Sequence, residues 1–172
     1  MKRAIIATLC LMAASTSQSA DWHATYKTDE MRGTSTKFLQ TVSDNSVEFD
    51  FPYSGGSNLT LVLRSKKTAL KKDQKPESLP VTEALLVISK GQFSCNSYDG
   101  CSVSVKFDDG KIQKYSMSGA EDSSSDVIFF DKSSSFIKNV KSHKKMIIEA
   151  SFFQEGDKQF KFDLTGIEQP KA

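Results

Sequence analysis

Two cysteines in the middle of the chain have the clearest chemistry. Cys95 and Cys101 are separated by five residues that include Asn, Asp and Gly, a composition typical of a hairpin loop. The ends of such a loop can bring two Cα atoms within the roughly 4.4 to 6.8 Å that a disulfide needs. We therefore predict a disulfide between Cys95 and Cys101 rather than a redox-active pair, which would use a spacing of two residues.

Other residues that could support catalysis or metal binding lack a recognisable arrangement. The two histidines, His23 and His143, are far apart in the sequence and have no paired ligand beside them. The S-x-x-K patterns at Ser135 and Ser142 and the S-D-N triplet at 43–45 are those of penicillin-recognising enzymes, but their order is reversed and no K-T-G follows. We expect no catalytic residue, no metal and no cofactor, with a small hydrolase as the alternative.

A lysine-rich segment is the best candidate for contact with a partner. Its basic residues are Arg64, Lys66, Lys67, Lys71, Lys72 and Lys75. Only Asp73 opposes them within 64–75, and each lysine close to an anionic surface contributes about 1 kcal/mol of attraction. The segment therefore predicts contact with an anionic surface; the alternative is a solvated loop that its charge keeps soluble.

The first 20 residues resemble a secretory signal peptide. Met1-Lys2-Arg3 is followed by an uncharged apolar run over 4–14 and then by small and polar residues. Cleavage after Ser19 or Ala20 would release a periplasmic or secreted protein. The apolar run is shorter than the roughly 20 residues of a membrane-spanning helix, and no later stretch approaches that length, so we expect no transmembrane segment. Lipidation at Cys10 is an alternative, but the residues before it do not favour acylation.

Removal of the signal peptide changes the charge balance. Subtracting Lys2 and Arg3 from the 23 basic residues leaves 21, which equals the number of acidic residues. Only Arg32 and Arg64 then remain as arginines, whereas proteins that read nucleic acids normally use several of them. We therefore expect no nucleic-acid partner.

The remaining sequence predicts a single β-rich domain over 21–172. Short stretches with alternating or continuous apolar residues, typical of strands, lie at 34–42, 47–51, 59–63, 81–89, 103–107 and 160–164. Asp108-Asp109-Gly110 and Glu155-Gly156-Asp157 are typical of hairpin turns. The pattern predicts an all-β fold, an antiparallel β-sandwich or a small barrel.

One short helix is expected near 134–142, because Phe136, Ile137 and Val140 have helical spacing after the serines at 133–135; another strand is the alternative. The predicted core takes alternate apolar residues of the strands. They are Phe49, Phe51, Leu61, Leu63, Leu86, Ile88, Val103, Val105, Ile147, Phe160 and Phe162.

Two resemblances add to these predictions. The runs 47–57, 59–64, 88–95 and 105–110 resemble a family of small, uncharacterised secreted proteins of Gram-negative bacteria and their prophages, which implies a periplasmic or exported location and brings no assigned activity. The order of a cysteine hairpin, a short helix and a closing hairpin in the second half is similar to that of invasion-associated locus B proteins. That looser resemblance implies an exported β-sandwich.

Taken together, these features predict an exported, non-enzymatic binding or inhibitory module that acts through loop surfaces of a β-sandwich. Its partner would be an unknown protein or an envelope component. An envelope structural or assembly component is the main alternative.

Overall fold

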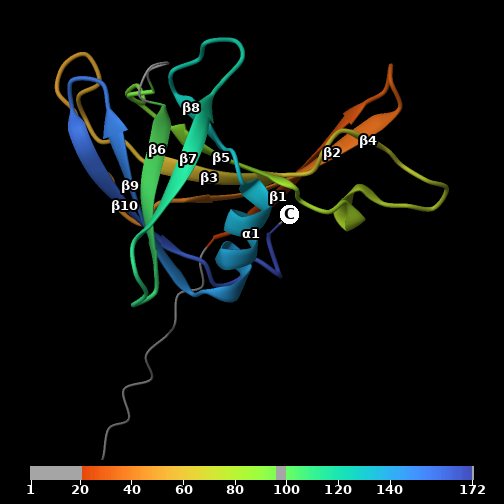
Figure 1. Cartoon of the computed structure of the whole chain (residues 1–172). Helices are drawn as coiled ribbons and strands as arrows, with labels where there is room; N and C mark the ends of the chain where they lie inside the picture. The colour runs from red at the N-terminus through yellow and green to blue at the C-terminus, as the bar shows by residue number, and fades with distance from the viewer. Residues whose placement is uncertain (1–20, 96–99, 172) are drawn as a thin grey trace, which may run out of the picture.

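The computed structural model describes residues 21–95 and 100–171; the predicted signal peptide at 1–20 and Cys10 lie outside the described residues. The regular secondary structure of the described chain is mostly β-sheet, with one short α-helix (Figure 1). The elements are β1 His23–Asp29, β2 Thr34–Val42, β3 Leu59–Arg64, β4 Thr68–Ala69, a 3-10 turn at Pro76–Ser78, β5 Glu83–Ile88, β6 Cys101–Phe107, β7 Gln113–Gly119, β8 Val127–Phe130, α1 Ser133–Ser142, β9 Lys145–Phe152 and β10 Gly156–Asp163.

The strands form one antiparallel sheet that curls around a shared core. Their order is β1-β2-β3-β5-β8-β7-β6-β9-β10, and β4 pairs with β2 beside this path. The sheet does not close into a barrel, because β1 and β10 remain at its two ends. The predicted antiparallel, sandwich-like all-β fold is therefore confirmed. The predicted hairpin turns are confirmed between β6 and β7 and between β9 and β10.

A side-chain contact joins the β2–β3 connection to the outer edge of β10. The Asn45 Nδ2 group donates to the carbonyl of Gln159 at 3.0 Å, and the Lys161 N–H donates to Asn45 Oδ1 at 2.7 Å. The Asp44 N–H also donates to the Lys161 carbonyl at 2.8 Å. Asn45 thus occupies part of an edge where a neighbouring strand would otherwise pair.

The core contains most of the predicted residues and a large share of the aromatic side chains. Phe136 of α1 stacks on Phe130 of β8, with ring centroids 3.7 Å apart, and contacts Tyr115 edge-on. At the other end of the core, Phe152 packs against Phe93 and Phe49. The helix therefore covers one end of the curled sheet. Its predicted position and its buried face are confirmed.

The predicted core was wrong at two residues. Phe51 is 90% exposed, because residues 47–51 do not form a strand; only Val47 makes an isolated bridge, to Ser57, and the chain turns at Phe51–Pro52. In β9, Met146, Ile148 and Ala150 face the core, which places the adjacent Ile147 on the opposite face. The remaining members of the predicted core are buried.

Other local predictions need correction as well. The strand patterns missed β1, β4, β7, β8 and β9. In β7 only Tyr115 and Met117 are buried, so its apolar signal is weak. The serines at 133–135 do not cap the helix with a side chain; Ser133 Oγ instead donates to the Phe130 carbonyl and accepts the Ala84 N–H. The serine therefore ties α1 to β5 and β8.

The predicted disulfide between Cys95 and Cys101 is present, with the Cα atoms 4.6 Å apart; the intervening residues 96–99 lie outside the described part. No helix in the described ranges is both long and apolar enough to cross a membrane.

Candidate binding site on the basic arm

The lysine-rich segment lies on an arm that projects from the body of the domain (Figure 1). We define the basic arm as residues 64–80 together with the β1–β2 hairpin on which they lie. Residues 68–69 pair with 34–35 of β2, the Lys37 N–H donates to Ser65 Oγ at 2.9 Å, and Lys37 Nζ donates to the Glu77 carbonyl at 2.7 Å. The predicted loop is therefore held against β2 at Ser65, at residues 68–69 and at Glu77.

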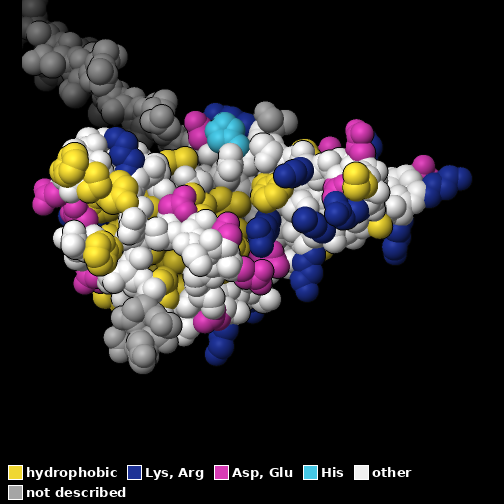
Figure 2. Space-filling view, turned by 90° about the horizontal axis from the view of Figure 1, so that it is seen from above, with side chains coloured by type: hydrophobic (Ala, Val, Ile, Leu, Met, Phe, Trp, Pro, Cys, Tyr) yellow, Lys and Arg dark blue, Asp and Glu magenta, His cyan; other side chains and the backbone are white. Residues whose placement is uncertain are grey.

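Positive side chains gather on this arm, whereas many exposed hydrophobic groups lie at the opposite end of the molecule (Figure 2). All five predicted lysines are exposed, namely Lys66, Lys67, Lys71, Lys72 and Lys75. The arm thus brings the predicted lysines to one part of the surface, although they divide into two groups.

The first group lines a hollow at the base of the arm. Lys66 and Lys67 lie on its rim, and Arg64 also lines it. The second group, Lys71, Lys72 and Lys75, lies farther along the segment and does not line the hollow. The structure therefore supports one built site at 64–67 and a separate exposed basic stretch at 71–75.

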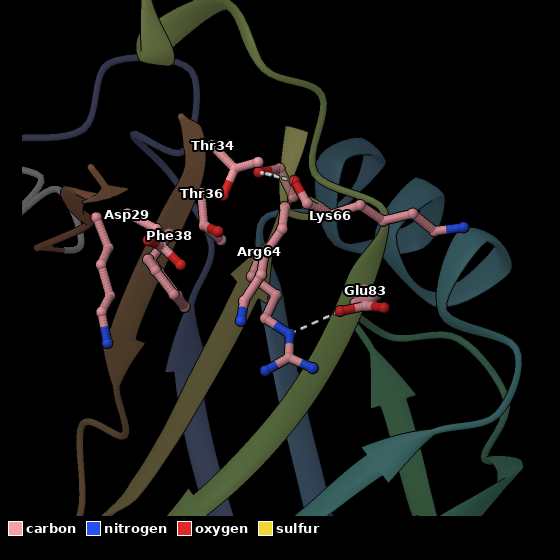
Figure 3. Close-up of a pocket in the computed structure, with 10 residues that line it drawn as sticks. Asp29, Thr34, Thr36, Phe38, Arg64, Lys66 and Glu83 are labelled. Atoms are coloured by element: carbon pink, nitrogen blue, oxygen red, sulfur yellow. Dashed lines mark hydrogen bonds and ion pairs between the residues drawn. The ribbon is translucent and has the colours of Figure 1, made fainter. Parts of the chain in front are cut away.

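Arg64 has a different environment from the lysines. Its Nε donates to Glu83 Oε2 at 2.6 Å, and its guanidinium lies over the ring of Phe129 at 5.2 Å from the ring centroid. Figure 3 shows the Arg64 side chain directed at Glu83. The guanidinium is therefore engaged by neighbouring strands, and we assign it a structural role beside the site.

Strand register explains how the hollow forms. Side chains at alternate positions share one face of a sheet, so Thr34, Thr36 and Phe38 lie in a row along β2 (Figure 3). The register places Lys27 of β1 opposite Thr36 and Arg64 opposite Phe38. With the segment 65–67 as one wall, these strands line an open hollow of about 650 Å³.

The predictions from sequence missed Lys27 and the two threonines. Lys27 and Asp29 alternate with polar residues in β1, and this strand lacks the apolar alternation that identifies a strand from sequence. The only signal was the alternation Thr34, Thr36 and Phe38 within a correctly predicted strand. Which of its two faces would meet the lysines depends on pairing with β1, which the sequence does not reveal.

The two carboxylates in the hollow are engaged by arginines. Asp29 Oδ2 accepts a hydrogen bond from Arg32 Nη1 at 3.0 Å, and Oδ1 accepts the Arg32 N–H. The side-chain hydrogen bond from Arg32 is the main reason that the pKa of Asp29 lies below its ordinary value of 3.8, and the charge of Lys67 lowers it further. Glu83 is held by Arg64. The lysines therefore dominate the electrostatics of the hollow.

Ser43 of the S-D-N triplet makes its hydrogen bonds within the fold. Ser43 Oγ donates to the Asn45 carbonyl at 2.7 Å and accepts the Leu59 N–H at 3.1 Å, so the S-D-N triplet shapes the β2–β3 connection. His143 follows α1, where its Nδ1 lies 2.8 Å from the Asn139 carbonyl and its ring packs on Phe107.

Within the described ranges, no three His, Cys, Asp or Glu side chains are grouped so that they could hold a metal ion. A comparison of the chain with protein-family models, with curated proteins and with solved structures found no match in any of the three.

Proposed function

We propose that this protein is an exported, non-enzymatic binding module whose basic arm contacts anionic, phosphate-bearing surfaces such as the headgroups of phospholipid or lipopolysaccharide. The observation that carries this proposal is the gathering of five exposed lysines on one projecting arm, while the carboxylates at its base are engaged by arginines.

The attachment of the arm to β2 favours binding. A flexible basic loop would lose conformational entropy on contact with a surface, whereas a segment already ordered by backbone pairing loses less. The contacts of Lys37 with Ser65 and Glu77 hold the segment at both ends of its basic part. Because exposed charges are screened over roughly 8 to 10 Å at physiological ionic strength, binding should weaken as salt rises.

The test compares two variants that remove the same number of charges. The arm variant replaces Lys66, Lys67, Lys71 and Lys72 by Gln. The control variant replaces four exposed lysines outside the arm by Gln, namely Lys111, Lys114, Lys138 and Lys141. Co-sedimentation with vesicles of phosphatidylglycerol and phosphatidylcholine at low and moderate salt measures the binding of each.

We expect the arm variant to lose affinity by at least about tenfold, since each lysine near the surface contributes about 1 kcal/mol, and the control variant to lose much less. Equal losses in the two variants would show that net charge alone matters and would contradict the proposal, as would a lack of binding by the unmodified protein at low salt.

A second function, an envelope assembly component that binds another protein, is favoured by exposed aromatic residues away from the arm. Phe51 is 90% and Phe153 is 58% exposed. The Asp50 N–H donates to Glu155 Oε1 at 2.7 Å, so the loops that carry these rings are joined. The double variant Phe51→Ser and Phe153→Ser should abolish recovery of a protein partner if this end is the contact, and leave vesicle binding unchanged.

A further inference from the structure

The hollow at the base of the basic arm contains a polar group that the protein does not use. Thr36 is only 8% exposed, and its side chain lines the hollow. Its hydroxyl has no hydrogen-bond partner among the described residues. By contrast, the neighbouring strand residues Thr28 and Ser35 bond to each other through their hydroxyls at 3.2 Å.

The Thr36 oxygen keeps contact with the solvent in the hollow, because the fully buried side-chain atoms without a partner among the described residues are Trp22 Nε1 and Thr82 Oγ1. A hydroxyl that has no protein partner bonds to water or to a ligand. Since the Thr36 hydroxyl opens into a space of about 650 Å³, an acceptor that enters this space can replace the water bound to it.

The charges around Thr36 select the sign of that group. Lys27 is paired with Thr36 in the β1–β2 ladder. Lys67 also lines the hollow, and its charge is close enough to Asp29 to lower the pKa of that carboxylate. Neither lysine has a carboxylate oxygen within 4.0 Å among the described residues, whereas the two carboxylates in the hollow are paired with Arg32 and Arg64. Two ammonium groups and a hydroxyl donor are thus available to an anion.

We infer that this hollow binds a phosphate group, with the Thr36 hydroxyl donating a hydrogen bond and the ammonium groups of Lys27 and Lys67 neutralising its charge. The inference rests on the proposed function and names the chemical group that the arm recognises. Phosphate fits because its acceptor oxygens point in several directions, and the donors here come from β1, β2 and the segment 65–67. The space also admits the group to which the phosphate is attached.

The first experiment titrates the protein with inorganic phosphate at constant ionic strength and follows backbone amide signals by NMR. We expect saturable shifts at Lys27, Thr36 and Lys67, and roughly five- to tenfold weaker binding in Thr36→Val, the effect of one lost hydrogen bond to a charged group. Thr36→Ser should restore binding. Thr60→Val, in a strand but outside the hollow, serves as the matched control and should bind like the unmodified protein.

The stability of the variants separates a ligand site from a structural hydroxyl. Because the Thr36 hydroxyl has no protein partner, Thr36→Val should unfold at the same or a higher denaturant concentration than the unmodified protein. A clear loss of stability would mean that the hydroxyl serves the fold and would overturn the inference, as would the absence of saturable shifts or unchanged phosphate affinity in Thr36→Val.

Vesicle binding then distinguishes a lipid headgroup from a free phosphate and separates the two proposals. If vesicles bind through the arm lysines while phosphate causes no shifts, the phosphate site is wrong and the proposed function stands. If phosphate binds in a Thr36-dependent manner but vesicles do not, the hollow takes a small phosphorylated molecule and the proposed surface contact is wrong.

Discussion

Arg64 and Glu83 form an ion pair between β3 and β5, with Nε donating to Oε2 at 2.6 Å. Their side chains are 36% and 37% exposed, so solvent screens the attraction and the pair contributes at most about 1 kcal/mol. The pair therefore holds Arg64, a positive residue of the lysine-rich segment, against the sheet.

Replacement of Arg64 by Ala should therefore affect stability more than binding. We expect a loss of about 1 kcal/mol in the free energy of unfolding, since the variant loses both the pair with Glu83 and the contact with Phe129. Urea denaturation measures this loss. A large drop in vesicle affinity with unchanged stability would contradict the structural role of Arg64.

The contact between Asn45 and β10 makes a second prediction about stability. Asn45→Ala removes two hydrogen bonds to the backbone of Gln159 and Lys161, each with a net contribution of about 0.5 to 1.5 kcal/mol. We expect a loss of roughly 1 to 2 kcal/mol in denaturant unfolding. Asn45→Asp retains the acceptor and should lose less; equal stability of all three proteins would show that this contact does not hold the sheet together.

The contribution of Asp29 to the stability of the fold should depend on pH in a known direction. Its pKa lies below 3.8 because of Arg32, so the carboxylate stabilises the fold at neutral pH. This stabilisation decreases as the pH falls through the lowered pKa, because the folded state must then bind a proton that the unfolded state binds more readily. NMR titration of the Asp29 side chain should show the low pKa, and Arg32→Gln should raise it; an unchanged pKa in the variant would contradict this cause.

The disulfide should have a modest effect on stability. Cys95 and Cys101 close a short loop, and short loops restrict the unfolded chain less than long ones, so we expect about 2 kcal/mol or less. Mass spectrometry of unreduced, unfolded 21–172 should find no free thiol, and the double variant Cys95→Ser and Cys101→Ser should unfold at a lower urea concentration. Two free thiols in the unmodified protein would refute the bond.

Period-two patterns were sufficient for the fold class and for most of the core, because burial of one sheet face leaves a direct trace in the sequence. The patterns failed where the local sequence favours one orientation or structure and the strand pairing imposes another. Ile147 and Ile148 are equally apolar neighbours, and only the pairing of Ile148 with Val105 of β6 decides which one faces inward. Phe51 continues an alternating pattern, but the adjacent Pro52 lies in a turn.

The basic arm was predictable in part. The lysines of 64–75 are visible as a charge cluster, and the structure places them on one projection. The hollow was not predictable, since Lys27 and Thr36 are brought together by the β1–β2 register and Lys67 reaches them through the pairing of 68–69 with β2. Such non-local pairings leave no mark on a single sequence.

Footprinting of lysine amines is the measurement that tests the binding surface most directly. The protein is acetylated with and without vesicles that contain phosphatidylglycerol, and mass spectrometry gives the extent of modification at each lysine. We expect several-fold protection of Lys66, Lys67, Lys71, Lys72 and Lys75, and no change at the exposed residues Lys111, Lys138 and Lys141. Equal protection of both sets, or protection confined to the lysines outside the arm, would contradict the assignment of the basic arm as the contact surface.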